Sequence, residues 1–500
     1  MHRCLCIAEV VQAIASSIWP RSDLVSMGLT CQAFLYPAMN EVWRYLPNPS
    51  SLILLLPEHT RESGPENKLK IVKAPSHADW RRFELYARRV WELEYRLHDD
   101  DGNSYLDVDW TSVLHHYPGK TLLPNLRELV IHRSITSSFC SLFIQPPLRH
   151  LSLESLDDEE AAVVVPHLHK CASTLEILVM QGRSLENAAT FDDISRAISH
   201  LGALTDLYAD KLLAATIEHL SRLSSIKVMY FTLDDTTFDE AKLPFSLLER
   251  LYVRSSARDT GPVVSFLRRV ELPQLRHLTV LHSAQDNDVL PREYLTAVDV
   301  STLLSAAAAF PNIRSIAYED FRRVRAPPPP VSICRAEVLR PLHALSSLET
   351  LKLSRIPFIL APHDIDVLAQ TWPRLRVLFL GHDVDHAHCA IHVHDLLPFA
   401  LHSPTLDSLG LPLLIRKTSP GTVARPAFGT LRSQLRLLAI AGVELEYSAD
   451  TAAFLACAFP EARLLVSPNN RTDAFIALSR TKDTMVEMMR EALALRDEAA

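Results

Sequence analysis

The sequence predicts an α/β solenoid, in which parallel strands are backed by outer helices, preceded by three short N-terminal helices. Two observations support this fold class. A short apolar pattern, L-x-x-L-x-L, recurs along most of the chain, and the stretches between its copies read as helices that often end at a proline. The last two apolar positions of each copy lie two residues apart, so on a strand they point to one face. Each copy therefore predicts a short, half-buried strand.

Most copies of the pattern begin about 20 to 30 residues after the preceding copy, which is a typical period for a repeat solenoid. The copies are Leu126/Leu129/Ile131, Leu148/Leu151/Leu153, Leu175/Leu178/Met180, Leu248/Leu251/Val253, Leu275/Leu278/Val280, Ile313/Ile316/Tyr318, Leu348/Leu351/Leu353, Leu375/Leu378/Leu380, Leu406/Leu409/Leu411 and Leu435/Leu438/Ile440. Helices are expected at residues 192–201, 214–223, 263–272, 301–310, 364–372 and 452–459. Because a helix between two strands makes a crossover, the strands are expected to be parallel and to line a concave wall.

Composition narrows the class of protein. With 500 residues and 48% apolar content, the chain can bury a large core as one elongated repeat domain. A net charge of -8 gives no basic footprint for nucleic acid. The eight cysteines include no C-x-x-C pair and indicate reduced intracellular thiols. No run is suited to span a bilayer, and Glu9 and Gln12 interrupt a possible signal-peptide core. We therefore expect a cytoplasmic or nuclear protein without a membrane or nucleic-acid partner.

Residues 1–46 follow a different pattern, with an apolar stripe on a first helix, a stop at Pro20, a second helix starting near Ser22 or Asp23, and a third segment starting at Pro37. Three short helices cannot bury all their apolar surface among themselves, so something else must cover part of it. One interpretation is a cap that packs on the first repeat, since solenoids need capped ends. The other is a surface that binds a partner.

The repeats, over residues 90–470, resemble the leucine-rich repeat family, of the type with full helices that forms ribonuclease-inhibitor-like horseshoes. The first strand is expected at Val90/Leu93/Tyr95. Residues 47–89 are expected to form a polar linker at 58–79, followed by a basic helix at 81–89. Residues 471–500 read as an amphipathic helix that either closes the last repeat or reaches back to another surface.

The first 46 residues resemble an F-box, most closely its fungal versions. The matching features are Glu9 on the first helix, Asp23-Leu24 after a proline turn, Thr30-Cys31, Ala33-Phe34 and Val42-Trp43. The resemblance implies a Skp-type adaptor and a cullin scaffold as partners, so the chain would be a non-catalytic receptor subunit of an SCF-type ubiquitin ligase that selects a protein substrate. The residues expected to bind the adaptor are Ile7, Val10, Ile14, Leu24, Met27, Cys31, Phe34 and Trp43.

Several clusters could suggest chemistry, but each has a plainer interpretation. Residues 382–394 contain five histidines and a cysteine, which suit zinc, yet they follow a strand where repeats carry variable loops. Asp157 begins an acidic run that the dipole of a helix N-terminus would favour. The basic run 322–325 before four prolines could bind an acidic partner, or form a long loop. No glycine-rich phosphate loop and no G-x-S-x-G turn occurs. We therefore expect no catalytic residue, no metal and no cofactor.

A protein substrate is expected on the concave wall, where the residues flanking each buried pair face outward. Aromatic and arginine side chains are the usual anchors of protein interfaces, so the strand with Arg250, Tyr252 and Arg254 is the strongest candidate. The other residues expected at equivalent positions are Tyr208, His277, Thr279, Lys352 and Phe379. The alternative is that these are ordinary surface residues of a parallel sheet.

Overall fold

The computed structural model describes residues 5, 7–64, 68–96, 105–132, 135–182, 188–233, 242–255, 260–282, 295–320, 332–381, 391–413, 433–441, 449–466 and 479–490. The chain divides into two compact units, residues 1–226 and 227–500, which we call unit 1 and unit 2.

Unit 1 begins with three helices, α1 (Ala8–Ser16), α2 (Arg21–Thr30) and α3 (Gln32–Arg44), as the sequence predicts. The start of the third helix was predicted wrongly, because α3 begins at Gln32 and contains Pro37. Helix α2 begins at Arg21 and its N-cap residue is Pro20, so Ser22 and Asp23, near which the helix was expected to start, lie inside its first turn. Helix α3 runs directly into β1 (Tyr45–Leu46), which pairs with β4 (Glu92–Tyr95) in parallel. The three helices are thus joined to the first strand of a sheet.

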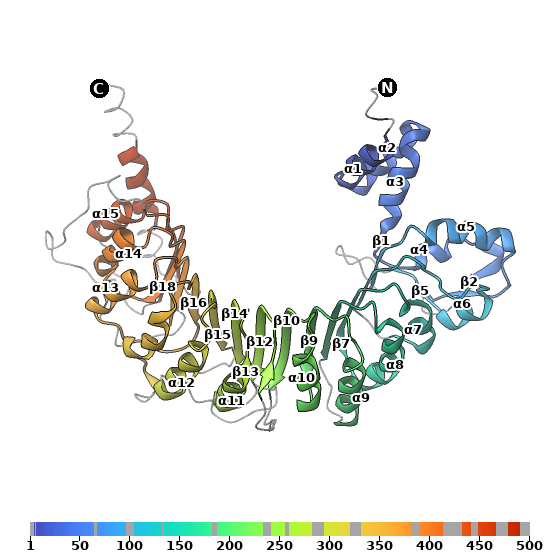
Figure 1. Ribbon diagram of the computed structural model, residues 1–500. Helices are drawn as coiled ribbons and strands as arrows, with labels where there is room; N and C mark the ends of the chain where they lie inside the picture. The colour runs from blue at the N-terminus through green and yellow to red at the C-terminus, as the bar shows by residue number, and fades with distance from the viewer. Residues whose placement is uncertain are drawn as a thin grey trace. The chain divides into compact units, whose positions relative to one another are not determined.

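The sheet of unit 1 has the strand order β1-β4-β6-β7-β8-β9, and neighbouring strands in it pair in parallel. Its further strands are β6 (Glu128–Ile131), β7 (His150–Leu156), β8 (Ile177–Gly182) and β9 (Asp206–Lys211). The helices between them are α6 (Trp110–His116), α7 (Ser137–Phe143), α8 (Asp158–Leu168) and α9 (Ala188–Ile198), and α10 (Ala214–Ser221) follows β9. These helices lie on one side of the sheet (Figure 1).

The polar linker predicted at residues 58–79 is instead folded. It contributes β2 (Arg61–Ser63) and β3 (Lys68–Ile71), which form a three-stranded sheet with β5 (Asp107–Val108). The short α4 (Ser50–Ile53) and η2 (Glu58–Thr60) precede these strands, and α5 (His77–Ala87) follows them. The lysines of β3 alternate with the buried Leu69 and Ile71, so the strand has one apolar face. The linker prediction relied on the polar composition of the segment and missed this alternation.

Unit 2 repeats the same arrangement, with parallel strands in the order β10-β12-β14-β15-β16-β17-β18-β19-β20. The strands are β10 (Val228–Leu233), β12 (Arg250–Ser255), β14 (His277–His282), β15 (Ser315–Asp320), β16 (Thr350–Leu353), β17 (Val377–Leu380), β18 (Ser408–Pro412), β19 (Leu437–Ala441) and β20 (Arg463–Val466). The helices are α11 (Gly261–Arg269), α12 (Ala297–Ala307), η6 (Ala336–Ala344), α13 (Pro362–Thr371), η7 (Val393–Leu396), α14 (Leu397–His402) and α15 (Ala449–Ala458). A separate pair, β11 (Leu243–Pro244) and β13 (Val270–Glu271), joins two of the connections.

The apolar positions of the repeated pattern stack in register, which confirms the predicted fold class. Leu251 of β12 pairs with Leu278 of β14, and Val253 pairs with Val280. All four side chains are buried. Because a fully buried aliphatic side chain contributes about 1.5 to 3 kcal/mol relative to an exposed one, these columns supply much of the stability of the solenoid. The helices α11 to α15 lie on one side of the strands (Figure 1), and we call the opposite side the open face of each unit.

The last described segment, residues 479–490, is helical and packs on the final repeat. The ammonium group of the buried Lys482 donates to the carbonyl oxygen of Pro460 at 3.2 Å, and Val486 is also buried. Arg490 forms an ion pair with Glu461, which lies two residues before β20. Of the two interpretations of the C-terminal helix, these contacts fit the one in which it closes the last repeat.

Candidate functional site

The three N-terminal helices hold the residues expected to bind an adaptor, but they do not place all of them on one surface. Ile7 and Ile14 are exposed, whereas Val10, Met27, Cys31, Phe34 and Trp43 are partly buried. Leu24 is buried, with 5% of its surface exposed. The expectation of one shared surface therefore needs a correction, because Leu24 belongs to the core of the three-helix unit.

The same helices and their connections expose large apolar side chains that are not among the residues expected to bind an adaptor. Trp19 has 84% of its surface exposed and Leu29 has 80%. The others are Val25, Leu35 and Tyr36. With Ile7 and Ile14, residues 7–36 therefore carry seven exposed large apolar side chains. The described residues contain nineteen such side chains in all, so these 30 positions hold more than a third of them. We call these seven residues the N-terminal apolar cluster.

Trp43, in contrast, is engaged within unit 1. Its ring lies 4.8 Å from the ring of Tyr86 on α5, measured between centroids. Close by, the guanidinium of Arg89 donates to Asn40 of α3 at 3.0 Å. Trp43 is therefore placed to attach α3 to α5, and its partly buried ring offers less surface to a partner than Trp19 does.

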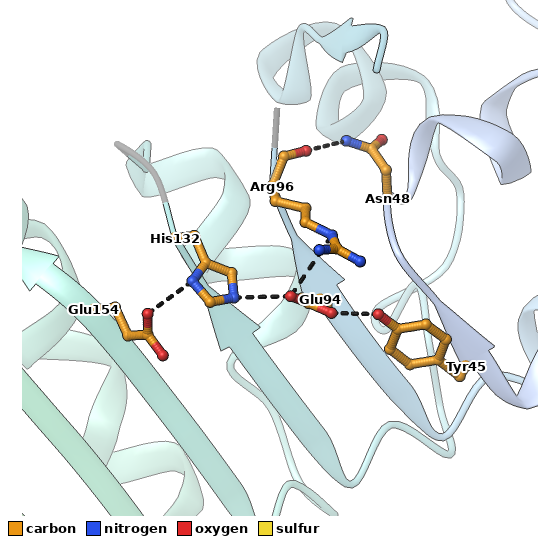
Figure 2. A network of polar contacts seen from close by, with 6 residues as sticks. All are labelled: Tyr45, Asn48, Glu94, Arg96, His132 and Glu154. Carbon is orange, nitrogen blue, oxygen red and sulfur yellow. Dashed lines mark hydrogen bonds and ion pairs between the residues drawn. The ribbon is translucent and has the colours of Figure 1, made fainter. Parts of the chain in front are cut away.

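A polar network fixes the strand that follows α3 to the rest of the sheet. It comprises Tyr45, Asn48, Glu94, Arg96, His132 and Glu154 (Figure 2). The hydroxyl of Tyr45 donates to Glu94, whose other carboxylate oxygen lies 2.9 Å from Nε2 of His132. Nδ1 of His132 lies 2.8 Å from Glu154. Ionised carboxylates only accept hydrogen bonds, so His132 satisfies both contacts when both ring nitrogens carry protons.

The network also changes the chemistry of Tyr45. Burial, followed by the hydrogen bond to Glu94, raises the pKa of Tyr45 to about 12. The phenol therefore stays protonated at neutral pH and keeps donating to Glu94. The network joins four strands of one sheet, which makes it a structural connection between the three-helix unit and the repeats.

The open face of unit 2 carries all the residues expected to contact a substrate except Tyr208, which lies on β9 in unit 1. The parallel register places Tyr252 beside Tyr230 on one neighbouring strand and beside Thr279 on the other. Arg250 pairs in register with His277. Further along the same sheet, the ammonium group of Lys352 lies 6.0 Å from the ring centroid of Phe379. The structure thus brings the arginine strand and His277 together and places Lys352 with Phe379 two or more strands away.

The open faces of the two units differ in charge. In unit 1, the alternating outward positions of β4, β6, β7, β8 and β9 carry six carboxylates and no Lys or Arg: Glu92, Glu94, Glu128, Glu154, Asp206 and Asp210. In unit 2, the equivalent positions of β10, β12, β14, β15, β16 and β17 carry three cations, Arg250, Arg254 and Lys352, and one carboxylate, Glu319. Four of the six carboxylates of unit 1 already have partners: Glu92 pairs with Arg44, Glu94 with Arg96, Glu128 contacts His150 and Glu154 contacts His132.

A groove of about 1030 Å³ lies at the start of strands β16 to β20 in unit 2. Its lining contains three arginines and three carboxylates, in addition to Thr405 and Gln434. The charged residues are Glu349, Arg374, Arg376, Asp407, Arg436 and Glu461. Arg314 pairs with Glu349 at 3.3 Å and Arg436 pairs with Asp407 at 3.6 Å. The lining thus contains equal numbers of positively and negatively charged side chains.

The histidine-rich segment 382–394 lies mostly outside the described residues, which resume at Ile391. Within the described part, the backbone amide of His392 donates to Asp395 at 2.8 Å, and the ring of His394 packs edge-on against Phe454. No group of three or more metal-ligating side chains occurs in the part of the chain that the structure describes. No described helix has the length and apolar character needed to cross a membrane.

Comparisons with known proteins place the fold in context. The sequence matches no protein-family model, and no curated protein matches it. Among solved structures, a chain of the Rad7 and Elc1 complex in yeast is similar, with 13% identity, 83% of this chain and 92% of that chain covered, and a TM-score of 0.33. Internalin C2 from Listeria monocytogenes is similar at 17% identity, with 38% and 73% covered and a TM-score of 0.22.

A protein from Bacteroides fragilis is also similar, at 15% identity, with 51% of this chain and 66% of that chain covered and a TM-score of 0.23. The highest of these three TM-scores is 0.33. The fold is therefore assigned from the chain's own strands and helices, which define an α/β solenoid of leucine-rich repeat type.

Proposed function

We propose that this chain is the substrate-recognition adaptor of an SCF-type ubiquitin ligase. Its three N-terminal helices would bind a Skp-type adaptor, which joins it to a cullin scaffold, and its repeats would bind a protein substrate. The mechanism would be proximity, so no residue of this chain would have to make or break a bond. The observation that supports the proposal best is the N-terminal apolar cluster.

Single exposed apolar residues are common on protein surfaces, but a concentration of them marks an interaction site. The cluster combines two nearly fully exposed side chains, Trp19 and Leu29, with five more in the same 30 residues. Covering each such side chain with a partner contributes about 1.5 to 3 kcal/mol. Each side chain of the cluster that a partner covers would therefore add to the free energy of binding.

A second candidate is a leucine-rich repeat scaffold that binds proteins but whose N-terminal helices serve only as a cap. The contact of Trp43 with Tyr86 and the pairing of β1 with β4 favour it, because both attach the helices to the repeats. A cap explains why α3 continues into the sheet. It leaves Trp19 and Leu29 uncovered, however, and the adaptor proposal accounts for these two residues.

Isothermal titration of the full-length protein with a purified fungal Skp-type adaptor separates the two candidates. The adaptor proposal expects binding by the unaltered protein and loss of binding in the variant Trp19→Glu/Leu29→Glu. A matched control, Val298→Glu/Leu401→Glu, places the same charges at exposed apolar positions of outer helices in unit 2 and is expected to bind normally. No binding by the unaltered protein would leave the scaffold candidate.

A further variant separates surface from core. Leu24→Ala removes a buried side chain of α2 and is expected to destabilise the three-helix unit by about 2 to 5 kcal/mol. Leu29→Ala, on the same helix, is expected to change stability by less than about 0.5 kcal/mol. If Leu29→Ala loses adaptor binding but keeps its stability, Leu29 contacts the adaptor. Loss of adaptor binding in Leu24→Ala would not identify a contact, because that variant is also expected to lose stability.

A further inference from the structure

The groove at the start of strands β16 to β20 contains carboxylates that are already neutralised. Each of its three carboxylates forms an ion pair with an arginine, and two of these three arginines lie outside the lining of the groove. The pairs are Glu349 with Arg314, Asp407 with Arg436, and Glu461 with Arg490. The carboxylates therefore leave the other two arginines of the lining without a negative partner.

These two arginines are Arg374 and Arg376, and both side chains are exposed. Neither guanidinium makes a hydrogen bond or an ion pair with any of the described residues. They flank Leu375, which is buried, so the backbone that carries them is anchored in the core. A guanidinium keeps its charge at physiological pH and has five hydrogen-bond donors. The groove therefore presents two permanent positive charges whose donors are free.

The order of charges along this edge of the sheet explains why Arg376 is unpaired. The backbone amide of Arg376 donates to Glu349, and the amide of Asp407 donates to Arg376, both at 2.8 Å. Arg376 therefore lies between two carboxylates. Each of them instead pairs with the arginine on its other side, Glu349 with Arg314 and Asp407 with Arg436. A row of three arginines and two carboxylates leaves one arginine unmatched, and here it is the central one.

The groove suits carboxylates that belong to a peptide. A guanidinium forms two parallel hydrogen bonds with a carboxylate, so two unpaired arginines match two acidic side chains. Gln434 also lines the groove, is exposed, and has no hydrogen bond from its amide to the described residues, so it is available to a peptide backbone. The volume of about 1030 Å³ is sufficient for a short segment. A nucleic acid fits less well, because its regularly spaced phosphates would also meet the three carboxylates.

We propose that this groove binds a short acidic segment of a protein, in which two neighbouring carboxylates pair with Arg374 and Arg376. The amide of Gln434 hydrogen-bonds to the backbone of the segment. This inference rests on the proposed function in one respect, that the repeats hold a protein substrate. The groove belongs to unit 2 and the N-terminal apolar cluster belongs to unit 1, so the two proposals are tested with different substitutions.

The test uses the full-length protein and fluorescein-labelled probes, with binding followed by anisotropy at low ionic strength, where charge pairs are least screened. The peptide GSSEESSG carries the two neighbouring carboxylates. Its controls are GSSQQSSG, which has amides in their place, and GSSKKSSG, which has lysines. Only the glutamate peptide is expected to bind. Equal binding of the glutamate and glutamine peptides would overturn the proposal, and so would tighter binding of a labelled single-stranded oligothymidine.

The variant Arg374→Gln/Arg376→Gln is expected to weaken binding of the glutamate peptide by at least about tenfold, because it removes two charged hydrogen-bond donors. The matched control is Arg268→Gln/Arg340→Gln. It removes two exposed arginines of α11 and η6 that also have no carboxylate partner among the described residues, and it is expected to bind normally. Equal binding by the two variants, or equal loss in both, would overturn the proposal.

A substitution that strengthens binding gives an independent check. Asp407→Asn removes the negative charge that pairs with Arg436, so a third arginine becomes available in the groove. The asparagine keeps an oxygen that can accept the hydrogen bond from the hydroxyl of Ser408, which is 2.9 Å long in the unaltered protein. This variant is expected to bind the glutamate peptide about two- to fivefold more tightly. Unchanged or weaker binding would contradict the assignment of the site.

Titration of the Arg374→Gln/Arg376→Gln protein with the Skp-type adaptor distinguishes the two proposals. Normal adaptor binding combined with lost peptide binding supports both. Normal adaptor binding combined with unchanged peptide binding overturns only the acidic-segment proposal. Peptide binding without any adaptor binding by the unaltered protein overturns only the ligase function.

Discussion

Trp43 of α3 and Tyr86 of α5 pack with their ring centroids 4.8 Å apart and their planes inclined by 47°. This contact joins the last N-terminal helix to the helix that precedes β4. An aromatic pair of this kind contributes about 0.5 to 1.5 kcal/mol beyond the area that it buries. It accounts for the partial burial of Trp43, which the F-box resemblance assigned to the adaptor-binding surface.

The first prediction concerns this pair. A double-mutant cycle with Trp43→Ala and Tyr86→Ala is expected to give a coupling of about 0.5 to 1.5 kcal/mol in the free energy of unfolding, because each substitution removes the same contact. Urea unfolding followed by far-ultraviolet circular dichroism measures the four proteins. Additive effects of the two substitutions would mean that the rings do not stabilise each other.

The second prediction concerns three buried thiols, Cys140, Cys171 and Cys334. Burial raises the pKa of Cys140 and of Cys334 to about 12, and that of Cys171 to about 11. Because the thiolate is the reactive form, these three cysteines are expected to resist alkylation by iodoacetamide at pH 8 in the folded protein. Peptide mass spectrometry after brief labelling tests each site.

The same three cysteines should be labelled rapidly once urea unfolds the chain, which is the internal control. Rapid labelling of Cys140 in the folded protein would show that helix α7, where it lies, opens far more readily than its burial indicates. Cys31 is partly exposed and serves as a reference site within the same sample.

The third prediction is a pH dependence at His277. Burial, followed by the charge of Arg250, lowers the pKa of His277 below its ordinary value of 6.5. The unfolded chain therefore binds this proton more readily than the folded chain, so the contribution of His277 to stability is present above pH 6.5 and is lost as pH falls below it. Thermal unfolding at pH 7.5 and 5.5 measures the effect.

The variant His277→Gln is expected to lose less stability than the unaltered protein between these two pH values, since it has no proton to take up. Identical pH profiles for the variant and the unaltered protein would contradict the lowered pKa.

The regular parts of the fold could be predicted because each strand carries its own signal. Leu278 and Val280 mark β14 by their spacing alone, and the structure stacks them on Leu251 and Val253 as expected. β10 and β20 were not singled out. In β10 the inward positions are Met229 and Phe231, so a search for leucines passes over a strand that is packed in the same way.

The candidate site was harder to predict, because burial on a helix depends on its partners. Leu24 and Leu29 both lie on α2, yet Leu24 is buried and Leu29 is exposed. The sequence gives no partner for either residue, and only the packing of α2 with α3 decides between them. The residues on the open face of unit 2 were easier to predict. Side chains alternate between the two faces of a strand, so the sequence of β12 alone assigns Arg250, Tyr252 and Arg254 to one face.

The most direct test of the adaptor proposal is amide hydrogen exchange of the full-length protein, with and without the purified fungal Skp-type adaptor. The proposal predicts slower exchange confined to α1, α2 and α3, strongest around Trp19 and Leu29, because the partner covers the N-terminal apolar cluster. Unchanged exchange in residues 8–44 when the adaptor is present in excess would contradict it.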